Sequence, residues 1–128
     1  MPITASTLIE VKRIKGKGRG VFAREFIPEG TLIERVPVIV LPQADLYRPG
    51  GTSGIWEYAF EWNTGQVAVA LGFGSMYNHS YTPNAYYQDA GPQQKEFLAW
   101  EDIKKGEEIT INYNGDPDDQ SKMWFDVK

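Results

Sequence analysis

The amino-acid sequence predicts a mostly β fold, with several small sheets of short strands and little helix. Short runs rich in β-branched and aromatic residues recur along the chain, and glycine or proline turn signals separate them. Between residues 56 and 62 an aromatic residue stands at every second position, which is the period of a strand. No segment carries a sustained apolar pattern with the 3.6-residue period of a helix.

The length and composition favour one packed domain, residues 1–128. A chain of 128 residues lies within the usual range for a single domain, and 41% hydrophobic residues can fill an interior. The sequence contains no internal repeat, low-complexity tract or linker composition.

In the first half of the chain we expect five strands. Residues 31–41 are rich in β-branched side chains, but Pro37 and Pro42 predict an edge strand or an interrupted one. The alternating aromatics predict a strand with one aromatic face, and the turn signal at 63–66 joins it to a returning strand in a hairpin. The expected strands cover residues 7–14, 21–23, 31–41, 56–62 and 67–71.

The second half continues with short strands. Residues 72–79 could form one helical turn, and strands are expected at 85–87, 96–100 and 108–113, separated by glycine-containing turns. Residues 116–128 begin as a polar segment and then reach Met123-Trp124-Phe125. We expect this aromatic end to dock on the body of the protein or on a partner.

Charge and cysteine content exclude several classes. Residues 1–48 hold eight basic and five acidic residues, a net charge of +3, whereas residues 49–128 hold five basic and twelve acidic ones, a net charge of −7. This balance argues against direct nucleic-acid binding and suits a basic partner. With no cysteine and one histidine, we expect neither a disulfide nor a metal site.

The sequence also predicts where the protein is found. Residues 1–6 lack the charged and apolar regions of a signal peptide, and the longest apolar stretch, residues 36–42, is too short to span a bilayer. We therefore expect a soluble, cytoplasmic protein without membrane contact, or one in a host nucleus if the protein is viral or a delivered effector.

Two segments are candidates for ligand binding or catalysis. The glycine-rich stretch 16–20 fits neither a dinucleotide-binding fingerprint nor a phosphate-binding loop, and it is either a simple turn or a bare backbone that a ligand can approach. Asn78-His79-Ser80 holds the single histidine, and a lone histidine is more often a hydrogen-bonded structural group than a catalyst. A serine hydrolase is disfavoured because no Gly-x-Ser-x-Gly elbow is present.

Three segments together resemble one family. Residues 18–23 are similar to the opening motif of SET domains, residues 77–84 to their Asn-His-Ser-x-x-Pro-Asn motif, and residues 106–113 to their closing Gly-Glu-Glu-(Leu/Ile)-Thr-x-x-Tyr strand. All three occur in the family's order and spacing. The length and residues 70–74 resemble most closely the minimal stand-alone SET proteins of large algal viruses and bacteria. The resemblance implies a SET domain, or β-clip, with knot-like C-terminal threading and residues 114–128 as a closing segment.

The resemblance also implies an activity, the transfer of a methyl group from S-adenosylmethionine to the side-chain amine of a lysine in another protein. By the family's pattern Tyr113 is the catalytic tyrosine, with its hydroxyl beside the transferring methyl group. The residues expected to hold the cofactor are Lys17, Gly18, Arg19, Gly20, Asn78, His79, Tyr113 and Trp124, the last by stacking on the adenine.

Two further residues are expected at the substrate. Tyr58 would form a wall of the lysine channel, where an aromatic face attracts the charged amine, although core packing is the alternative. Ile111 matches the family position whose bulk influences how many methyl groups are added. Tyr81 stands where most members have cysteine, and their zinc-binding clusters are missing, so Trp124 or Phe125 would have to close the pockets.

The expected substrate is a protein lysine, in a histone tail or another Lys/Arg-rich protein. The missing zinc-bearing closure makes a homodimer that completes the pocket a reasonable hypothesis. Two alternatives remain open: a catalytically silent, SET-like binding module for basic peptides, and an enzyme with a non-histone target. Loss of turnover in Tyr113→Phe would separate an enzyme from a binding module.

Overall fold

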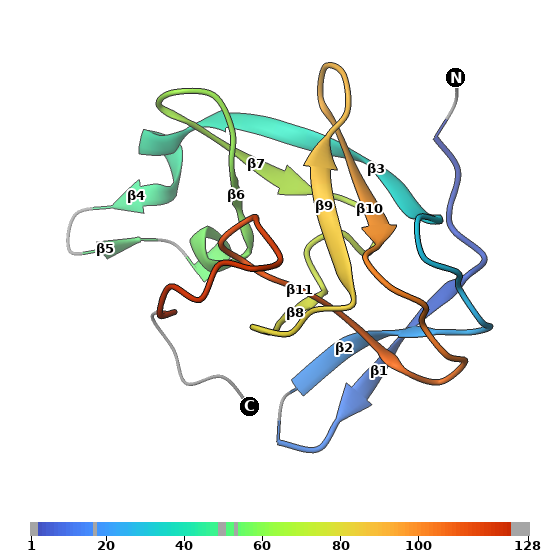
Figure 1. Ribbon diagram of the computed structural model, residues 1–128. Helices are drawn as coiled ribbons and strands as arrows, with labels where there is room; N and C mark the ends of the chain where they lie inside the picture. Colours follow the sequence, from blue (N-terminus) through green and yellow to red (C-terminus); the bar gives the residue numbers. More distant parts are fainter. Residues whose placement is uncertain (1–2, 17, 49–50, 53, 124–128) are drawn as a thin grey trace.

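Two curled sheets and a short ribbon make up the part of the chain that the computed structural model describes, residues 3–16, 18–48, 51–52 and 54–123. The strands are β1 (Ile9–Ile14), β2 (Gly18–Ala23), β3 (Leu32–Pro42), β4 (Tyr47–Arg48), β5 (Gly51–Thr52), β6 (Phe60–Glu61), β7 (Gln66–Ala70), β8 (Asn78–His79), β9 (Ala85–Asp89), β10 (Gln94–Ala99) and β11 (Glu108–Ile111). One sheet has the order β1-β2-β11-β8, another β6-β7-β3-β10-β9, and β4 pairs with β5 (Figure 1). The predicted mostly β fold is confirmed.

Helix is confined to two short 3-10 segments within these ranges, η1 (Gln43–Leu46) and η2 (Gly54–Tyr58). Neither is long and apolar enough to cross a membrane.

Strand β3 changes its pairing partner at a proline. Up to Pro37 it pairs with β10, and from Val38 to Pro42 it pairs with β7 on its other side. Proline has no backbone N–H and cannot donate a ladder hydrogen bond, so the change falls where a bond would be missing. Neither predicted alternative describes β3 as a whole, because it is one continuous strand in the middle of its sheet, although each half pairs on one side only.

The predicted strand from residue 56 to residue 62 is wrong in its first half. Gly54–Tyr58 form the 3-10 helix η2, and only Phe60–Glu61 form strand β6. The hairpin is confirmed, because β6 pairs with β7 across the predicted turn. Packing explains the break: the Phe60 ring packs edge-on against Tyr87 and Phe97, whereas Tyr58 is 52% exposed.

Residues 71–76 form tight turns where one helical turn was predicted. The N–H of Gly74 donates to the carbonyl of Leu71 at 3.0 Å, and the N–H of Met76 donates to that of Phe73 at 2.9 Å. The chain then straightens into β8. The strands predicted at 85–87, 96–100 and 108–113 correspond to β9, β10 and β11.

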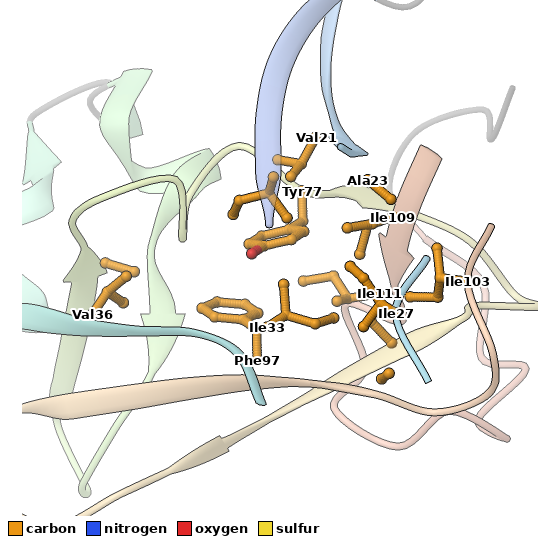
Figure 2. Packing of buried hydrophobic residues seen from close by; sticks show 14 of the residues in the cluster. Val21, Ala23, Ile27, Ile33, Val36, Tyr77, Phe97, Ile103, Ile109 and Ile111 are labelled. Carbon is orange, nitrogen blue, oxygen red and sulfur yellow. The ribbon is translucent and has the colours of Figure 1, made fainter. Parts of the chain in front are cut away.

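The hydrophobic core lies between the two sheets. Val21 and Ile109 come from the four-stranded sheet, and Ile33 and Phe97 come from the five-stranded one. In Figure 2 the Tyr77 ring lies over the ring of Phe97, and their centroids are 4.4 Å apart with planes 18° from parallel. Because Tyr77 directly precedes β8, this contact fixes the start of the Asn-His motif against the core.

Two strands that are distant in the sequence, β8 and β11, pair in parallel through Asn78 with Thr110 and His79 with Ile111. The side chain of Asn84 stabilises this pair, since its Nδ2 donates to a carbonyl of β11 at 2.8 Å and its Oδ1 accepts from the N–H of Thr110 at 2.9 Å. Strand β11 thus lies between β2 and β8 (Figure 1), in the region where the knot-like threading was predicted.

Candidate active site

A cleft of about 980 Å³ opens beside the first hairpin. Residues 13–16 and 18–19 form one side, residues 75–78 form another, and the rings of Tyr58 and Tyr113 complete it. Five of the predicted site residues therefore meet at one surface although they come from four separate parts of the chain: Gly18, Arg19, Tyr58, Asn78 and Tyr113.

The glycine-rich turn presents bare backbone to this cleft. Gly16 and Gly18 have φ angles of 82° and 89°, a left-handed conformation that side chains with a Cβ rarely adopt. A Cβ built at either position would meet no atom within 4 Å, so the space in front of each backbone is open. The stretch is a turn, and its backbone can also be approached by a ligand.

The side chain of Asn78 is held in one orientation. Its Nδ2 donates to the carbonyl oxygen of Arg19 at 2.9 Å and to Oε2 of Glu108 at 2.7 Å. Both amide hydrogens are then used, and Oδ1 is the atom of this side chain that can accept a hydrogen bond from a ligand. The sequence did not indicate this role of Glu108, because residues 78 and 108 become neighbours only through the pairing of β8 with β11.

Position 20 requires glycine because neighbouring atoms leave no room for a Cβ. A Cβ at this position would lie 2.5 Å from Oε2 of Glu108, 2.6 Å from Cδ1 of Ile14 and 3.0 Å from Nδ2 of Asn78. Gly20 is buried in β2 and does not line the cleft. The structure therefore places it behind the Asn78 side chain, where it makes room for the Asn78–Glu108 contact.

Tyr113 lies two residues beyond β11 and is fixed at both ends. Its hydroxyl donates to the backbone carbonyl oxygen of Tyr77 at 2.5 Å, and its backbone N–H donates to Nδ1 of His79 at 2.9 Å. Burial, with smaller contributions from nearby Tyr58 and Glu108, raises the pKa of Tyr113 to about 12. The hydroxyl therefore keeps its proton near neutral pH and is held at the cleft as a neutral group.

His79 supports the site from behind. It is 4% exposed and is not part of the cleft wall. Burial lowers the pKa of His79, which keeps the imidazole neutral and its Nδ1 able to accept from Tyr113. Its geometry is that of a positioning residue.

Tyr58 reaches the cleft from the end of η2. Its side chain is 52% exposed, and the hydroxyl of Ser75 donates to its backbone carbonyl at 3.4 Å. Of the two readings offered by the sequence, a wall of the cleft fits this exposure better than core packing does.

Ile111, predicted to contact the substrate, does not line the cleft. Its side chain is fully buried in the hydrophobic core and is not part of the cleft wall, which does not support direct contact with a substrate. The physical reason is alternation along β11, which turns Ile109 and Ile111 toward the core. Lys17, Trp124 and Phe125 lie outside the described residues, so their expected roles stay predictions.

Sequence reasoning predicted Arg19 but missed the two other basic residues of the cleft. Arg13, Lys15 and Arg19 all line it and are exposed. The signal that could have found Arg13 and Lys15 is their position directly before the glycine-rich turn, in the half of the chain with a net positive charge. Three cationic side chains beside the exposed glycine backbone favour a ligand that carries an anionic group.

A buried carboxyl supports the wall formed by residues 75–78. Glu34 in β3 is 5% exposed, and it accepts from the Tyr77 hydroxyl at 2.8 Å and from the N–H of Phe73 at 2.9 Å. Burial raises the pKa of Glu34, partly offset by these two hydrogen bonds. Among the described residues, no group of three or more His, Cys, Asp or Glu side chains is placed to hold a metal ion.

Comparison with known proteins agrees with this geometry. The model of the SET domain family matches residues 18–114. The chain is 36% identical over 127 residues to the "Histone-lysine N-methyltransferase, H3 lysine-37 specific" of Schizosaccharomyces pombe, covering 98% of this chain and 82% of that protein. It also resembles the crystal structure of a candidate histone methyltransferase from Plasmodium falciparum, with a TM-score of 0.70 and 28% identity, over 87% of this chain and 95% of the other.

These comparisons confirm the predicted family and fold. The closeness to viral and bacterial members stays a prediction. The family match covers most of the chain and contains all three motifs, at 18–23, 77–84 and 106–113. The chain therefore belongs to the SET-domain family of protein-lysine methyltransferases.

Proposed function

We propose that the cleft binds S-adenosylmethionine together with a lysine side chain of a protein substrate, next to Tyr113. The observation that carries this proposal is the Tyr113 hydroxyl, which is held against the carbonyl of Tyr77 at a cleft that three basic residues also line. When bound, S-adenosylmethionine supplies a methyl group on a positively charged sulfur.

The three basic residues of the cleft suit the amino-acid part of this cofactor. Arg13, Lys15 and Arg19 can attract its carboxylate, and Oδ1 of Asn78 can accept from its ammonium group. The open space in front of Gly16 and Gly18 lets a ligand approach the backbone closely. We also propose Lys17 and Trp124 as cofactor contacts, the latter from the closing segment 114–128.

Tyr113 and Tyr58 would orient the target amine. An amine must be neutral to act as a nucleophile, and a free lysine has a pKa of about 10.4. Tyr113, with a pKa of about 12, stays protonated and is not suited to be the base. We infer that the amine loses its proton to water on the way in, while Tyr113 fixes its direction and Tyr58 covers it from solvent. Positioning of this kind supplies much of the acceleration in a displacement reaction.

For the substrate we propose a basic protein segment, with a histone tail as the first candidate. Two observations support it: the net charge of −7 in residues 49–128, and the histone lysine in the name of the S. pombe relative. Another Lys/Arg-rich protein is the alternative. We also propose that a homodimer completes the pocket, because the sequence has no cysteine cluster to close it. A monomeric mass by light scattering at a protein concentration with full activity would contradict the homodimer.

The test is methyl transfer from labelled S-adenosylmethionine to purified core histones and, in parallel, to a cell extract. Wild-type protein is compared with Tyr113→Phe and with Tyr86→Phe, a matched control whose ring contacts Trp100 instead of the cleft. We expect label on lysines with wild type and Tyr86→Phe, and a large loss with Tyr113→Phe. Calorimetric cofactor binding without any transfer would support the binding-module alternative.

A further inference from the structure

Tyr81 contacts the C-terminal segment at two points. Its hydroxyl accepts a hydrogen bond from the backbone N–H of Met123 at 2.9 Å, and its backbone carbonyl accepts from Nε2 of Gln120 at 2.9 Å. The bonded residues are 42 and 39 positions apart in the sequence. Tyr81 therefore joins the turn after β8 to the end of the described chain.

The same side chain packs on the residue that fixes Tyr113. The rings of Tyr81 and His79 meet edge to face, with centroids 4.5 Å apart and planes at 89°. His79 also accepts a hydrogen bond from the N–H of Tyr113, and the centroids of these two rings lie 5.2 Å apart. Ring contacts through His79 therefore connect Tyr81, which bonds the C-terminal segment, with Tyr113 at the cleft.

Two asparagine side chains hold neighbouring residues of the C-terminal segment. Asn112 donates to the carbonyl of Asp119 at 2.5 Å, and Asn114 donates to that of Ser121 at 3.0 Å. These side chains come from the strand end that leads into the segment, so they hold it locally. Tyr81 instead connects residues 120 and 123 to the turn after β8.

We propose that Tyr81 is a positioning residue that ties residues 120–123 to the His79–Tyr113 pair. Its hydroxyl fixes the point from which the chain continues to Trp124, and its ring supports the imidazole beneath Tyr113. The consequence for cofactor binding rests on the proposed function above. The tie itself is a property of the fold and can be measured without turnover.

Two substitutions separate the two contacts. Tyr81→Phe keeps the ring against His79 and removes the acceptor for Met123, whereas Tyr81→Ala removes both. Tyr86→Phe is the matched control, since it removes a hydroxyl from a tyrosine that packs on Trp100. Hydrogen exchange at single amides measures the hydrogen bond between Tyr81 and Met123. Separate KM and kcat values measure how that contact affects the site.

In Tyr81→Phe we expect exchange at the Met123 amide to rise roughly 5-fold, the value of one net hydrogen bond. Exchange at Ser121, whose N–H donates to Asp119, should stay unchanged. KM for S-adenosylmethionine should rise several-fold with kcat little altered, and Tyr81→Ala should lower kcat as well. If Tyr81→Phe matches Tyr86→Phe in Met123 exchange, the proposal is wrong. An inactive wild-type protein would overturn the proposed function, while Met123 exchange would still decide the tie.

Discussion

The hydroxyl of Tyr113 donates a 2.5 Å hydrogen bond to the backbone carbonyl oxygen of Tyr77, the residue directly before β8. The bond joins two residues that are 36 positions apart, one in each of two motifs. It also directs the hydroxyl proton toward the backbone of Tyr77.

Removing this hydroxyl should affect catalysis more than folding. In Tyr113→Phe we expect methyl transfer to fall on the order of 100-fold, comparable to the loss of one preorganised polar group in other active sites. The free energy of unfolding should fall by only about 1 kcal/mol, the net value of a typical hydrogen bond. Single-turnover rates and denaturant unfolding measure the two effects. Equal activity of Tyr113→Phe and wild type would remove Tyr113 from the reaction.

Gly20 is expected to tolerate no side chain. In Gly20→Ala the new Cβ would collide with Glu108, Ile14 and Asn78, and overpacking of this kind costs about 1 to 3 kcal/mol of unfolding free energy. Displacement of Asn78 should also weaken binding of S-adenosylmethionine in a calorimetric titration. Gly54→Ala is the control, because a Cβ there meets nothing within 4 Å. Matching stability of the two variants would show that the β1–β2 hairpin moves easily.

Lys95 is a buried cation inside the five-stranded sheet. It is 1% exposed, and its Nζ lies 4.5, 4.7 and 5.4 Å from the ring centroids of Phe60, Tyr87 and Trp62. Its Nζ also donates to Asp89 at 2.7 Å. Burial lowers the pKa of Lys95, while the contact with Asp89 acts in the opposite direction. The long side chain fills space among three aromatic rings.

We expect the packing of Lys95 to outweigh its charge. Lys95→Ala should lower the free energy of unfolding by about 2 to 4 kcal/mol, as other large-to-small core changes do. Lys95→Met keeps the volume and removes the cost of burying a charge, so it should cost less than about 1.5 kcal/mol. Urea unfolding of both variants measures this. A loss in Lys95→Met as large as in Lys95→Ala would mean that the ammonium contacts dominate.

His79 should make stability depend on pH. Burial holds the pKa of His79 below its ordinary value of 6.5, so the unfolded chain binds a proton at a higher pH than the folded protein does. The contribution of His79 to the free energy of unfolding is then fully present above pH 6.5. It decreases as the pH drops through the range between the two pKa values. Unfolding at about pH 7.5 and about pH 5.5, a range in which histidine is the side chain that ordinarily titrates, measures the loss.

The matched variant for this prediction is His79→Asn, whose Oδ1 can replace Nδ1 as the acceptor for the N–H of Tyr113. This variant loses the ring contacts and should be less stable at both pH values. Its stability should nevertheless change less between them, because the histidine was the only one in the chain. An equal pH dependence in both proteins would assign the effect to other groups.

Much of the fold and part of the site could be predicted from the sequence. β-branched runs, turn glycines and prolines indicated most strands, because these signals reflect local backbone preferences. The three motifs identified the family, and with it Gly18, Arg19, Asn78, Tyr58 and Tyr113 at one cleft. The alternating aromatic residues from 56 to 62 led to the wrong prediction of a single strand. A short segment can present aromatic residues to a core and to a cleft without being one strand.

The sequence by itself determined the class of fold, the family and the chemical groups available. Tertiary structure decided which of these groups meet. The parallel pairing of β8 with β11 brings Glu108 to Asn78 and His79 to Tyr113, and the return of the C-terminal segment brings Met123 to Tyr81. Such contacts join residues 30 or more positions apart, so local patterns carry no signal for them. They form when the two sheet faces are buried against each other, because polar groups that become buried must find partners within the protein.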